Sequence, residues 1–220
     1  MTSDITEQQV KAGQAPYSRL FLSVYDPMVS FNYRFIWKCH PRHVLDLYNK
    51  HVSANHLDVG VATGSLLDQC RFPAPNPRLA LMDLNRNSLG VAAKRLARYS
   101  PETYRRNVLE PIDVDAPRFD SVGVANLLHC LPGTMKTKGA VFQHLSALLN
   151  PAGTILGCTI LYGGVERSPQ ATLMMHLFNA TGAMANKLDD LEGLKRSLDQ
   201  NFSVSAVNAV GCVALFWARK

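Results

Sequence analysis

The chain has 220 residues, of which 47% are hydrophobic and 18% charged, a balance typical of one globular domain with a large buried core. The formal net charge is +6, but the basic residues are scattered without a long Lys/Arg run, so we expect no nucleic-acid partner. Five cysteines, odd in number and without a CxxC pair, indicate buried free thiols in a reducing compartment and no zinc site.

The N-terminal region is predicted to be helical, and it is expected to carry no targeting signal that would direct the protein out of the cytoplasm. It begins with MTSDITEQQVKAG, which lacks the apolar core of a signal peptide, and no apolar run of the chain is long enough to span a bilayer. We therefore expect a cytoplasmic protein with no membrane contact. Residues 17–53 place apolar and aromatic side chains at helical spacing, and Pro27 and Pro41 are expected to separate two or three short helices.

The rest of the chain alternates strand patterns with helix patterns. Strands are expected at 56–61, 78–85, 104–112, in the first part of 119–132, at 153–163 and in a closing antiparallel hairpin over 202–220. Helices are expected from residue 65, at 87–99 with Asn87 as a cap, at 137–153 and over 168–199. This alternation predicts an α/β fold, doubly wound around a mostly parallel sheet that is covered on both faces.

The stretch HLDVGVATGSLLDQC, residues 56–70, carries the first functional signal. It puts Asp58 at the end of an apolar strand and follows it with Gly60 and Gly64 before a helix. A dinucleotide fingerprint fits poorly, because it requires three glycines where this chain has Gly60, Ala62 and Ser65. The alternative pattern, acid-x-Gly-x-Gly-x-Gly, matches except for Ala62. It resembles motif I of the class I S-adenosylmethionine-dependent methyltransferases.

Three later stretches extend this resemblance. Asp83 lies 25 positions after Asp58 at the end of the second strand, FDSVGVANLLHCLP is similar to the family's fourth strand and exit loop, and LLNPAGT is similar to its helix–turn–strand five unit. The family's fold implies seven strands, with N-terminal helices as a lid over the cofactor. We accordingly expect one domain with a lid segment at 1–53, a core at 54–220 and a substrate-recognition insertion at about 164–199.

The resemblance implies S-adenosyl-L-methionine as cofactor and S-adenosyl-L-homocysteine as product. Asp58 is expected to hold the methionine end of the cofactor, and Asp83 the two ribose hydroxyls. The other expected cofactor contacts are Gly60, Ala62, Thr63, Gly64, Leu84, Asn107, Val108, Asn126, Leu127 and Leu128. Purely structural roles stay open for both acids: Asp58 could cap the following helix, and Asp83 could be a turn residue.

The expected reaction is methyl transfer to an O or N atom of a small molecule, with a secondary metabolite as the expected acceptor. His129 is the candidate base for an alcohol or phenol, although a histidine beside Cys and Leu is often only packed. The other candidate substrate contacts are Tyr17, Tyr25, Trp37 and Met175, for which core packing is the alternative. The chain is expected to be a monomer or homodimer and to bind no metal.

Two other functions remain open at this point. One is an enzyme of the same fold that catalyses a cyclisation or rearrangement without methyl transfer, because a fold does not fix its chemistry. The other is a scaffold protein with a degenerate pocket, which Ala62 and Asn107 would explain.

Overall fold

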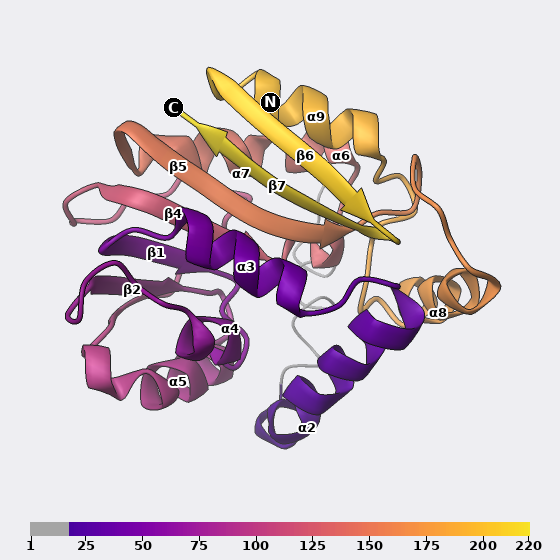
Figure 1. Ribbon diagram of the computed structural model, residues 1–220, viewed down its shortest axis with the longest axis horizontal. Helices are drawn as coiled ribbons and strands as arrows, with labels where there is room; N and C mark the ends of the chain where they lie inside the picture. Colours follow the sequence, from indigo (N-terminus) through magenta and orange to yellow (C-terminus); the bar gives the residue numbers. More distant parts are fainter. Residues whose placement is uncertain (1–17) are drawn as a thin grey trace.

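The computed structural model describes residues 18–220, and its centre is a seven-stranded sheet with the strand order β3-β2-β1-β4-β5-β7-β6 (Figure 1). The strands are β1 Asn55–Val59, β2 Arg78–Met82, β3 Glu102–Tyr104, β4 Phe119–Ala125, β5 Leu149–Ile160, β6 Val204–Val210 and β7 Val213–Arg219. The first five pair in parallel, and β7 is antiparallel to both β5 and β6. The predicted doubly wound sheet with an antiparallel C-terminal hairpin is confirmed.

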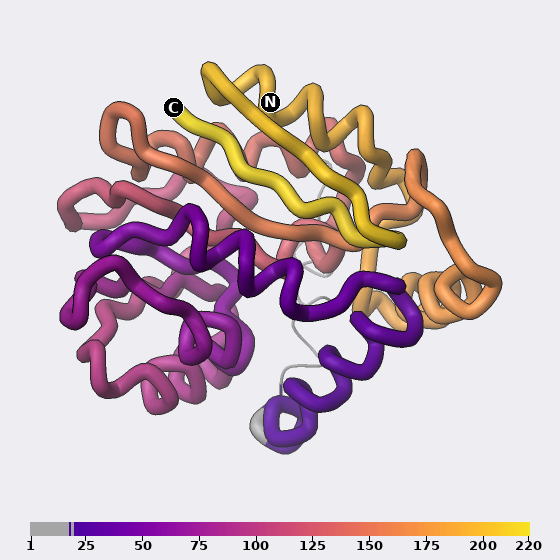
Figure 2. Tube along the Cα trace, in the orientation of Figure 1, coloured from indigo at the N-terminus to yellow at the C-terminus, as the bar shows by residue number. Residues whose placement is uncertain are grey.

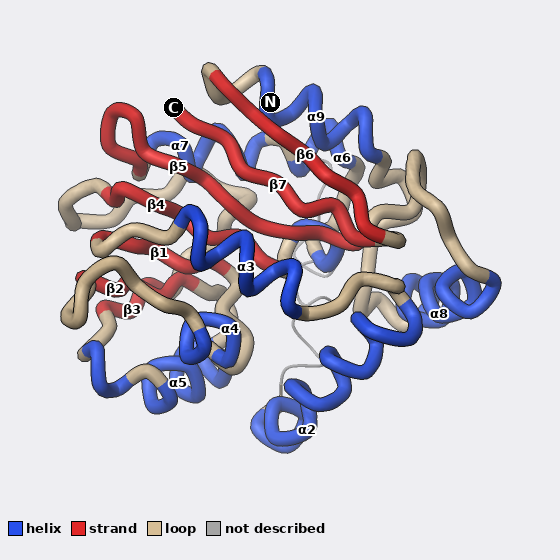
Figure 3. The backbone as a smooth tube through the Cα atoms, viewed as in Figure 1, coloured by secondary structure: helices blue, strands red, loops and turns tan. Residues whose placement is uncertain are grey.

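Helices cover both faces of this sheet (Figure 3). The α-helices are α2 Arg19–Phe31, α3 Arg42–His51, α4 Ser65–Gln69, α5 Arg86–Arg95, α6 Met135–Lys138, α7 Ala140–Ala147, α8 Pro169–Ala180 and α9 Leu191–Asp199. Shorter turns are the π-helical η1 Asn32–Ile36 and the 3-10 segments η2 Ala97–Tyr99 and η3 Leu128–Cys130. Helices α3, α4 and α5 pack on one face, and α6, α7 and α9 on the other.

The core is divided by the sheet into two apolar layers. Leu57 and Val122 belong to the layer that contains Phe142 of α7, whereas Leu81 belongs to the layer that contains Tyr48 of α3. Each of these side chains is fully buried. Burial on both faces explains why the parallel strands read as continuous apolar runs in the sequence.

The functional end of the sheet follows from its topology. The chain winds outward from β1 in both directions, through β2 to β3 on one side and through β4 to β5 on the other. In such sheets ligands bind at the carboxyl ends of the strands beside this switch point. In Figures 1 and 2, α2 and α8 extend beyond the sheet on the same side of the view, and α8 contacts η1.

Two sequence expectations about helices were wrong. Pro27 lies inside α2 instead of ending it, because a proline removes a single N–H donor and residues on both sides of it remain packed, including Leu22 and Tyr33. The cap of α5 is Asn85 and not Asn87. The Asn85 side chain accepts hydrogen bonds from the backbone N–H groups of Asn87 and Ser88 at 2.8 and 3.3 Å.

The boundaries of two strands and of one expected helix also differ. The third strand is Glu102–Tyr104 and not 104–112, because Val108 and its apolar neighbours pack into the core from a loop. The fifth strand begins at Leu149, so the Pro-Ala-Gly segment at the end of the helix expected over 137–153 lies within the strand. Residues 181–190 separate α8 from α9, where one helical stretch was expected.

Candidate active site

The loop after β1 has an unusual backbone. Gly60, Ala62 and Gly64 have φ angles of +75°, +45° and +73°, so three alternate residues lie in the left-handed region. A Cβ atom at Gly60 would lie 3.0 Å from the Cβ of Leu127, which leaves little space for a side chain there. Ala62 adopts a conformation that normally favours glycine. The N–H groups of this loop are used within the protein: those of Gly60 and Gly64 donate to the carbonyls of Met82 and Val61 at 2.8 Å each, and those of Val61 and Ala62 donate to the Asp83 carboxylate.

Asp58 is a buried acid with unused hydrogen-bonding capacity. Its side chain is enclosed by β2 and β4, and only 5% of the residue is exposed. The Tyr48 hydroxyl donates to Oδ1 at 3.0 Å, and Nε2 of His56 lies 3.6 Å from the same oxygen. Gly123 provides the space, because a Cβ there would lie 2.3 Å from Oδ1. The contacts that fix Asp58 are therefore on Oδ1, which leaves Oδ2 for a ligand.

Asp83 follows β2 directly and is held by backbone groups. Burial raises the pKa of its carboxyl to about 6, although hydrogen bonds from the N–H groups of Asn85, Ala62, Leu84 and Val61 act in the opposite direction. The Asn85 N–H lies 2.8 Å from Oδ1. The carboxylate is thus tied to the left-handed loop after β1, and the two strand ends form one unit.

Two adjoining cavities lie at this edge of the sheet. The narrow cavity, about 80 Å³, is lined by Asp83 and the loop after β3, and the wide cavity, about 420 Å³, by Asp58 and the N-terminal helices. Both are lined by Tyr25, Gly60, Ala62 and Asn126, and we call this shared region the junction. The combined space suits a bound cofactor with a small second ligand.

Most of the predicted cofactor residues come together around these cavities. The narrow cavity is lined by Gly60, Ala62, Asp83, Leu84, Asn107, Val108, Asn126 and Leu127, and the wide cavity by Tyr25, Asp58, Gly60, Ala62, Thr63 and Asn126. Gly64 lines neither, but its positive φ completes the loop. Tyr17 lies outside the described residues. Asn107 uses its amide oxygen to accept from the Leu109 N–H at 3.1 Å, so the predicted contact with adenine has to share that oxygen.

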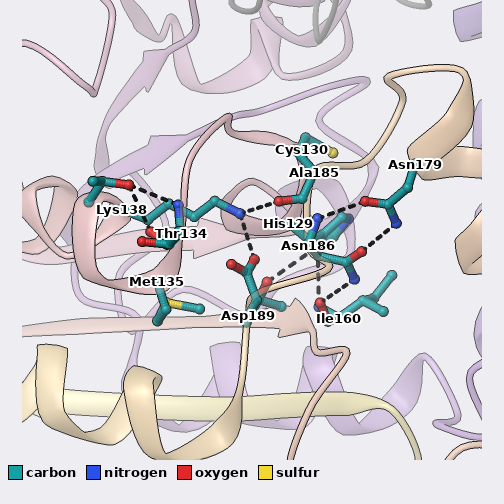
Figure 4. A network of polar contacts seen from close by, with 12 residues as sticks. His129, Cys130, Thr134, Met135, Lys138, Ile160, Asn179, Ala185, Asn186 and Asp189 are labelled. Carbon is teal, nitrogen blue, oxygen red and sulfur yellow. Dashed lines mark hydrogen bonds and ion pairs between the residues drawn. The ribbon is translucent and has the colours of Figure 1, made fainter. Parts of the chain in front are cut away.

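His129 lines neither cavity, which argues against its predicted role as a base. Its Nδ1 accepts a hydrogen bond from the Ile160 N–H at 3.2 Å, and its carbonyl accepts from the Ala185 N–H at 2.8 Å (Figure 4). Burial, with a smaller contribution from the positive charge of Lys138, lowers the pKa of His129 to about 3. A group that stays neutral to such low pH and accepts from the backbone is a structural link between η3, β5 and the segment after α8.

The network around His129 is completed by a buried ion pair. Nζ of Lys138 donates to Oδ2 of Asp189 at 2.6 Å and to the Ala185 carbonyl at 2.9 Å, and neither charged side chain is exposed (Figure 4). Asn186 donates to the Ile160 carbonyl at 3.0 Å and accepts from Asn179 at 2.8 Å (Figure 4). We call His129, Lys138, Asn179, Asn186 and Asp189 the insertion network.

Three further predicted contacts are core residues. Leu128 is fully buried in the layer with Phe142, because the η3 turn directs it into the core. Trp37 is 2% exposed and packs against Phe178 at a ring-centroid distance of 6.3 Å. Met175 is fully buried in the same layer as Trp37. None of the three lines either cavity.

The structure also adds cavity residues that the sequence analysis did not select. Asp26 of α2 lines the wide cavity. It accepts from Arg95 of α5 at 2.7 Å and from Thr63, and Arg95 also donates to Thr63 at 3.2 Å, so α2 is tied to the loop after β1. Arg34 and His40 line the wide cavity, with Nη2 of Arg34 2.8 Å from Nε2 of His40. Both residue types were visible in the sequence, but which of them face the cavity depends on tertiary packing.

Comparisons with known proteins agree with this geometry. A family model described as "Methyltransferase domain" matches residues 57–155. The demethylluteothin O-methyltransferase of Streptomyces thioluteus is 39% identical over 99% of this chain and 95% of its own length. The physcion biosynthesis cluster O-methyltransferase of Aspergillus chevalieri is 36% identical over 94% of this chain and 95% of its own length.

Solved structures show the same fold. The complex of DhpI with SAH superposes with a TM-score of 0.70 at 15% identity and covers 98% of both chains. The N-methyltransferase NodS from Bradyrhizobium japonicum WM9 in complex with S-adenosyl-L-homocysteine gives 0.56 at 18% identity, over 81% of this chain and 84% of NodS. The fold and the site thus define a class I methyltransferase. With relatives this similar over nearly their whole length, the chain belongs to the methyltransferase family and is an enzyme that transfers methyl groups.

The helices of residues 18–220 are all too short or too polar to cross a bilayer.

Proposed function

We propose that the chain is an S-adenosyl-L-methionine-dependent methyltransferase whose acceptor is an oxygen atom of a small molecule. The observation that carries this proposal is the pairing of Asp58 and Asp83 on either side of one left-handed loop, at the junction of two cavities. The named O-methyltransferases among the relatives support oxygen as the acceptor atom.

The residues present fit the cofactor in three respects. Asp83 offers a carboxylate for a vicinal diol in the narrow cavity, and Val108 and Leu84 provide apolar walls beside it for a flat base. Asp58 offers the free oxygen of a buried carboxylate to an ammonium group in the wide cavity. Gly60 and Ala62, the residues of the loop after β1 that line both cavities, have no bulky side chain.

When bound, this cofactor supplies a methyl group activated by a sulfonium. The chain contributes alignment and exclusion of water. Asp58 and Asp83 would hold the two ends of the cofactor from the wide and the narrow cavity, on either side of the junction. Residues of α2, η1 and α3 wall the wide cavity, where the acceptor is held, and we propose that segment 1–53 acts as a lid.

Isothermal titration calorimetry with S-adenosyl-L-methionine and S-adenosyl-L-homocysteine tests this proposal. We expect micromolar binding by the wild type and a loss of about a hundredfold in Asp83→Ala, since two charge-assisted hydrogen bonds disappear. Asp115→Ala is the matched control, because Asp115 is exposed and lines neither cavity. No binding by folded wild-type protein would overturn the proposal and favour the scaffold interpretation.

A further inference from the structure

Asn126 occupies a special place in the active site. It is the first residue after β4, adopts a left-handed φ of +59°, and lines both cavities at the junction. Its backbone N–H donates to the Cys158 carbonyl at 2.9 Å, which fixes the main chain against β5. The side chain of Asn126 is therefore presented from a rigid point between the two ligand spaces.

The orientation of the Asn126 amide is set by Tyr33. The Tyr33 hydroxyl donates to Oδ1 of Asn126, and Sγ of Cys158 approaches the same oxygen at 3.7 Å. Tyr33 is only 3% exposed, and burial raises its pKa well above the ordinary value, so the hydroxyl keeps the proton that it donates. With both lone pairs of Oδ1 engaged, the two N–H donors of the amide are the groups left for a ligand.

The charges around the wide cavity favour an anion next to these donors. Nη2 of Arg34, which lines the cavity, lies 2.8 Å from Nε2 of His40, and Arg34 has no carboxylate partner among residues 18–220. The two acids of the same cavity are otherwise engaged: Asp26 pairs with Arg95 at 2.7 Å, and Asp58 faces the proposed ammonium group. The positive charge of Arg34 in this cavity is therefore not paired with a carboxylate of the described residues.

The same cavity offers no evident base. His40 is the histidine that lines it among the described residues. Its Nδ1 accepts from the Arg42 N–H at 3.2 Å and its Nε2 lies 2.8 Å from Nη2 of Arg34, so both ring nitrogens already have partners within the protein. His129 lies elsewhere and serves the backbone of Ile160. An acceptor that has to lose a proton must then be acidic enough to lose it to solvent.

We propose that Asn126 and Tyr33 form an anion-binding unit, in which Tyr33 positions the Asn126 amide so that its N–H groups hold the ionised oxygen of an acidic phenol or enol. This inference rests on the proposed function. The acceptor hydroxyl gives its proton to solvent, an oxygen lone pair forms the new O–CH₃ bond, and the C–S bond breaks with its electron pair left on sulfur. The cationic sulfonium becomes a neutral thioether, and the anionic oxygen becomes a neutral ether.

The test uses 4-nitrophenol as the probe, because its ionisation is visible by absorbance. Each protein is saturated with S-adenosyl-L-homocysteine, and the affinity and the pKa of the bound phenol are measured. We expect the wild type to bind the anion and to lower its pKa. Asn126→Asp should weaken anion binding about 30-fold or more, since donors are replaced by a negative charge. Tyr33→Phe should weaken it about fivefold to tenfold and raise the pKa of the bound phenol, because the amide can then turn.

Two controls separate this role from others. Tyr162→Phe makes the same chemical change at a hydroxyl that contacts His176 and lines neither cavity, and it should leave anion binding unchanged. With 4-nitroaniline as an uncharged analogue, Asn126→Asp should lose less than threefold. Thermal melting reports whether each variant is folded.

The outcomes are distinct. If both variants lose affinity for S-adenosyl-L-homocysteine and for the anion equally, Asn126 belongs to the cofactor site and the proposal is overturned. No loss of anion affinity in either variant would also overturn it. Wild-type protein that binds S-adenosyl-L-homocysteine but not 4-nitrophenolate would also overturn it, while leaving the proposed function intact. Absence of any binding of S-adenosyl-L-homocysteine would instead be a failure of the proposed function.

Discussion

Two groups of buried polar side chains lie near the carboxyl ends of the strands, and they differ in how much hydrogen-bonding capacity is left over. In the site group, Asp58, Asp83 and Asn126 each line a cavity, and Asp58 and Asn126 are anchored through one oxygen. In the insertion network, the side chains bond to one another and to backbone, apart from Oδ1 of Asp189, which is buried without a partner. Hydrogen-bonding groups that face a cavity and have no partner within the protein therefore distinguish a ligand site from an equally polar structural network.

The largest effect should come from breaking the insertion network. Lys138→Met leaves Asp189 as an uncompensated buried acid, which should lower the free energy of unfolding by about 3–5 kcal/mol in urea titrations. Because the network lines neither cavity, the affinity of the folded fraction for S-adenosyl-L-homocysteine should stay within about twofold. The double variant Lys138→Met/Asp189→Leu removes both charges and should recover part of the stability. Loss of ligand affinity without loss of stability would contradict the distinction.

On the site side, the pKa of about 6 at Asp83 predicts a pH dependence of binding. The ribose hydroxyls need an ionised acceptor, so lowering the pH below 6 should weaken S-adenosyl-L-homocysteine binding by up to about tenfold per unit. Above pH 6 the affinity should level off. Calorimetry from pH 5 to 7 measures this, and Asp83→Asn, which cannot ionise, should give a flat profile. A sloping profile in that variant would assign the titration to another group.

His129→Asn sharpens the comparison from the other side. The asparagine retains an acceptor for the Ile160 N–H and cannot gain a proton, so methyl transfer should stay within about threefold, whereas loss of a base costs about 10²–10⁴. In the wild type, the folded pKa of about 3 lies below the ordinary 6.5, so the unfolded chain binds an extra proton between these values. His129 therefore makes the wild type lose stability as pH falls from 6.5 toward 3.

The His129→Asn variant should lose less stability over the same range. Urea titrations of both proteins at pH 7 and pH 4.5 isolate this difference, because the remaining titratable groups are common to both. If the variant loses as much free energy of unfolding between pH 7 and pH 4.5 as the wild type, His129 is not the group that makes the stability sensitive to acid. A large loss of methyl transfer with normal stability would restore its role as a base.

The sequence was enough to predict the fold and the placement of Asp58 and Asp83 at the ends of the first two strands, because both depend on local patterns. Apolar runs end at these acids, and the glycine spacing between them reports backbone conformation directly. His129 shows the limit. Lys138, whose positive charge helps to lower the pKa of His129, lies nearby in the chain. Asp189, the ion-pair partner of Lys138, is 51 residues further on, and only the folded structure shows that they form a network.

Side-chain direction is the second limit. Leu127 lines the narrow cavity while Leu128 is core, because one residue of a 3-10 turn changes the direction of the side chain. On the N-terminal helices, Tyr25 lines both cavities whereas Trp37 is packed against α8. Helical spacing predicted that these aromatic residues are buried, but which partner buries each of them depends on contacts far away in sequence.

The smallest expected effect concerns Ala62, where the sequence departs from the family's glycine and the structure shows φ of +45°. Ala62→Gly removes the strain of a Cβ in the left-handed region but also frees the unfolded chain, so we expect a net gain of about 0.5–1 kcal/mol. Ala93→Gly, in the interior of α5, is the matched control and should lose about 1 kcal/mol. If Ala62→Gly also tightens S-adenosyl-L-homocysteine binding severalfold, the methyl group restricts the junction. If stability rises while affinity stays constant, the loop strain is independent of the ligand, and Ala62 is compatible with a fully formed cofactor site.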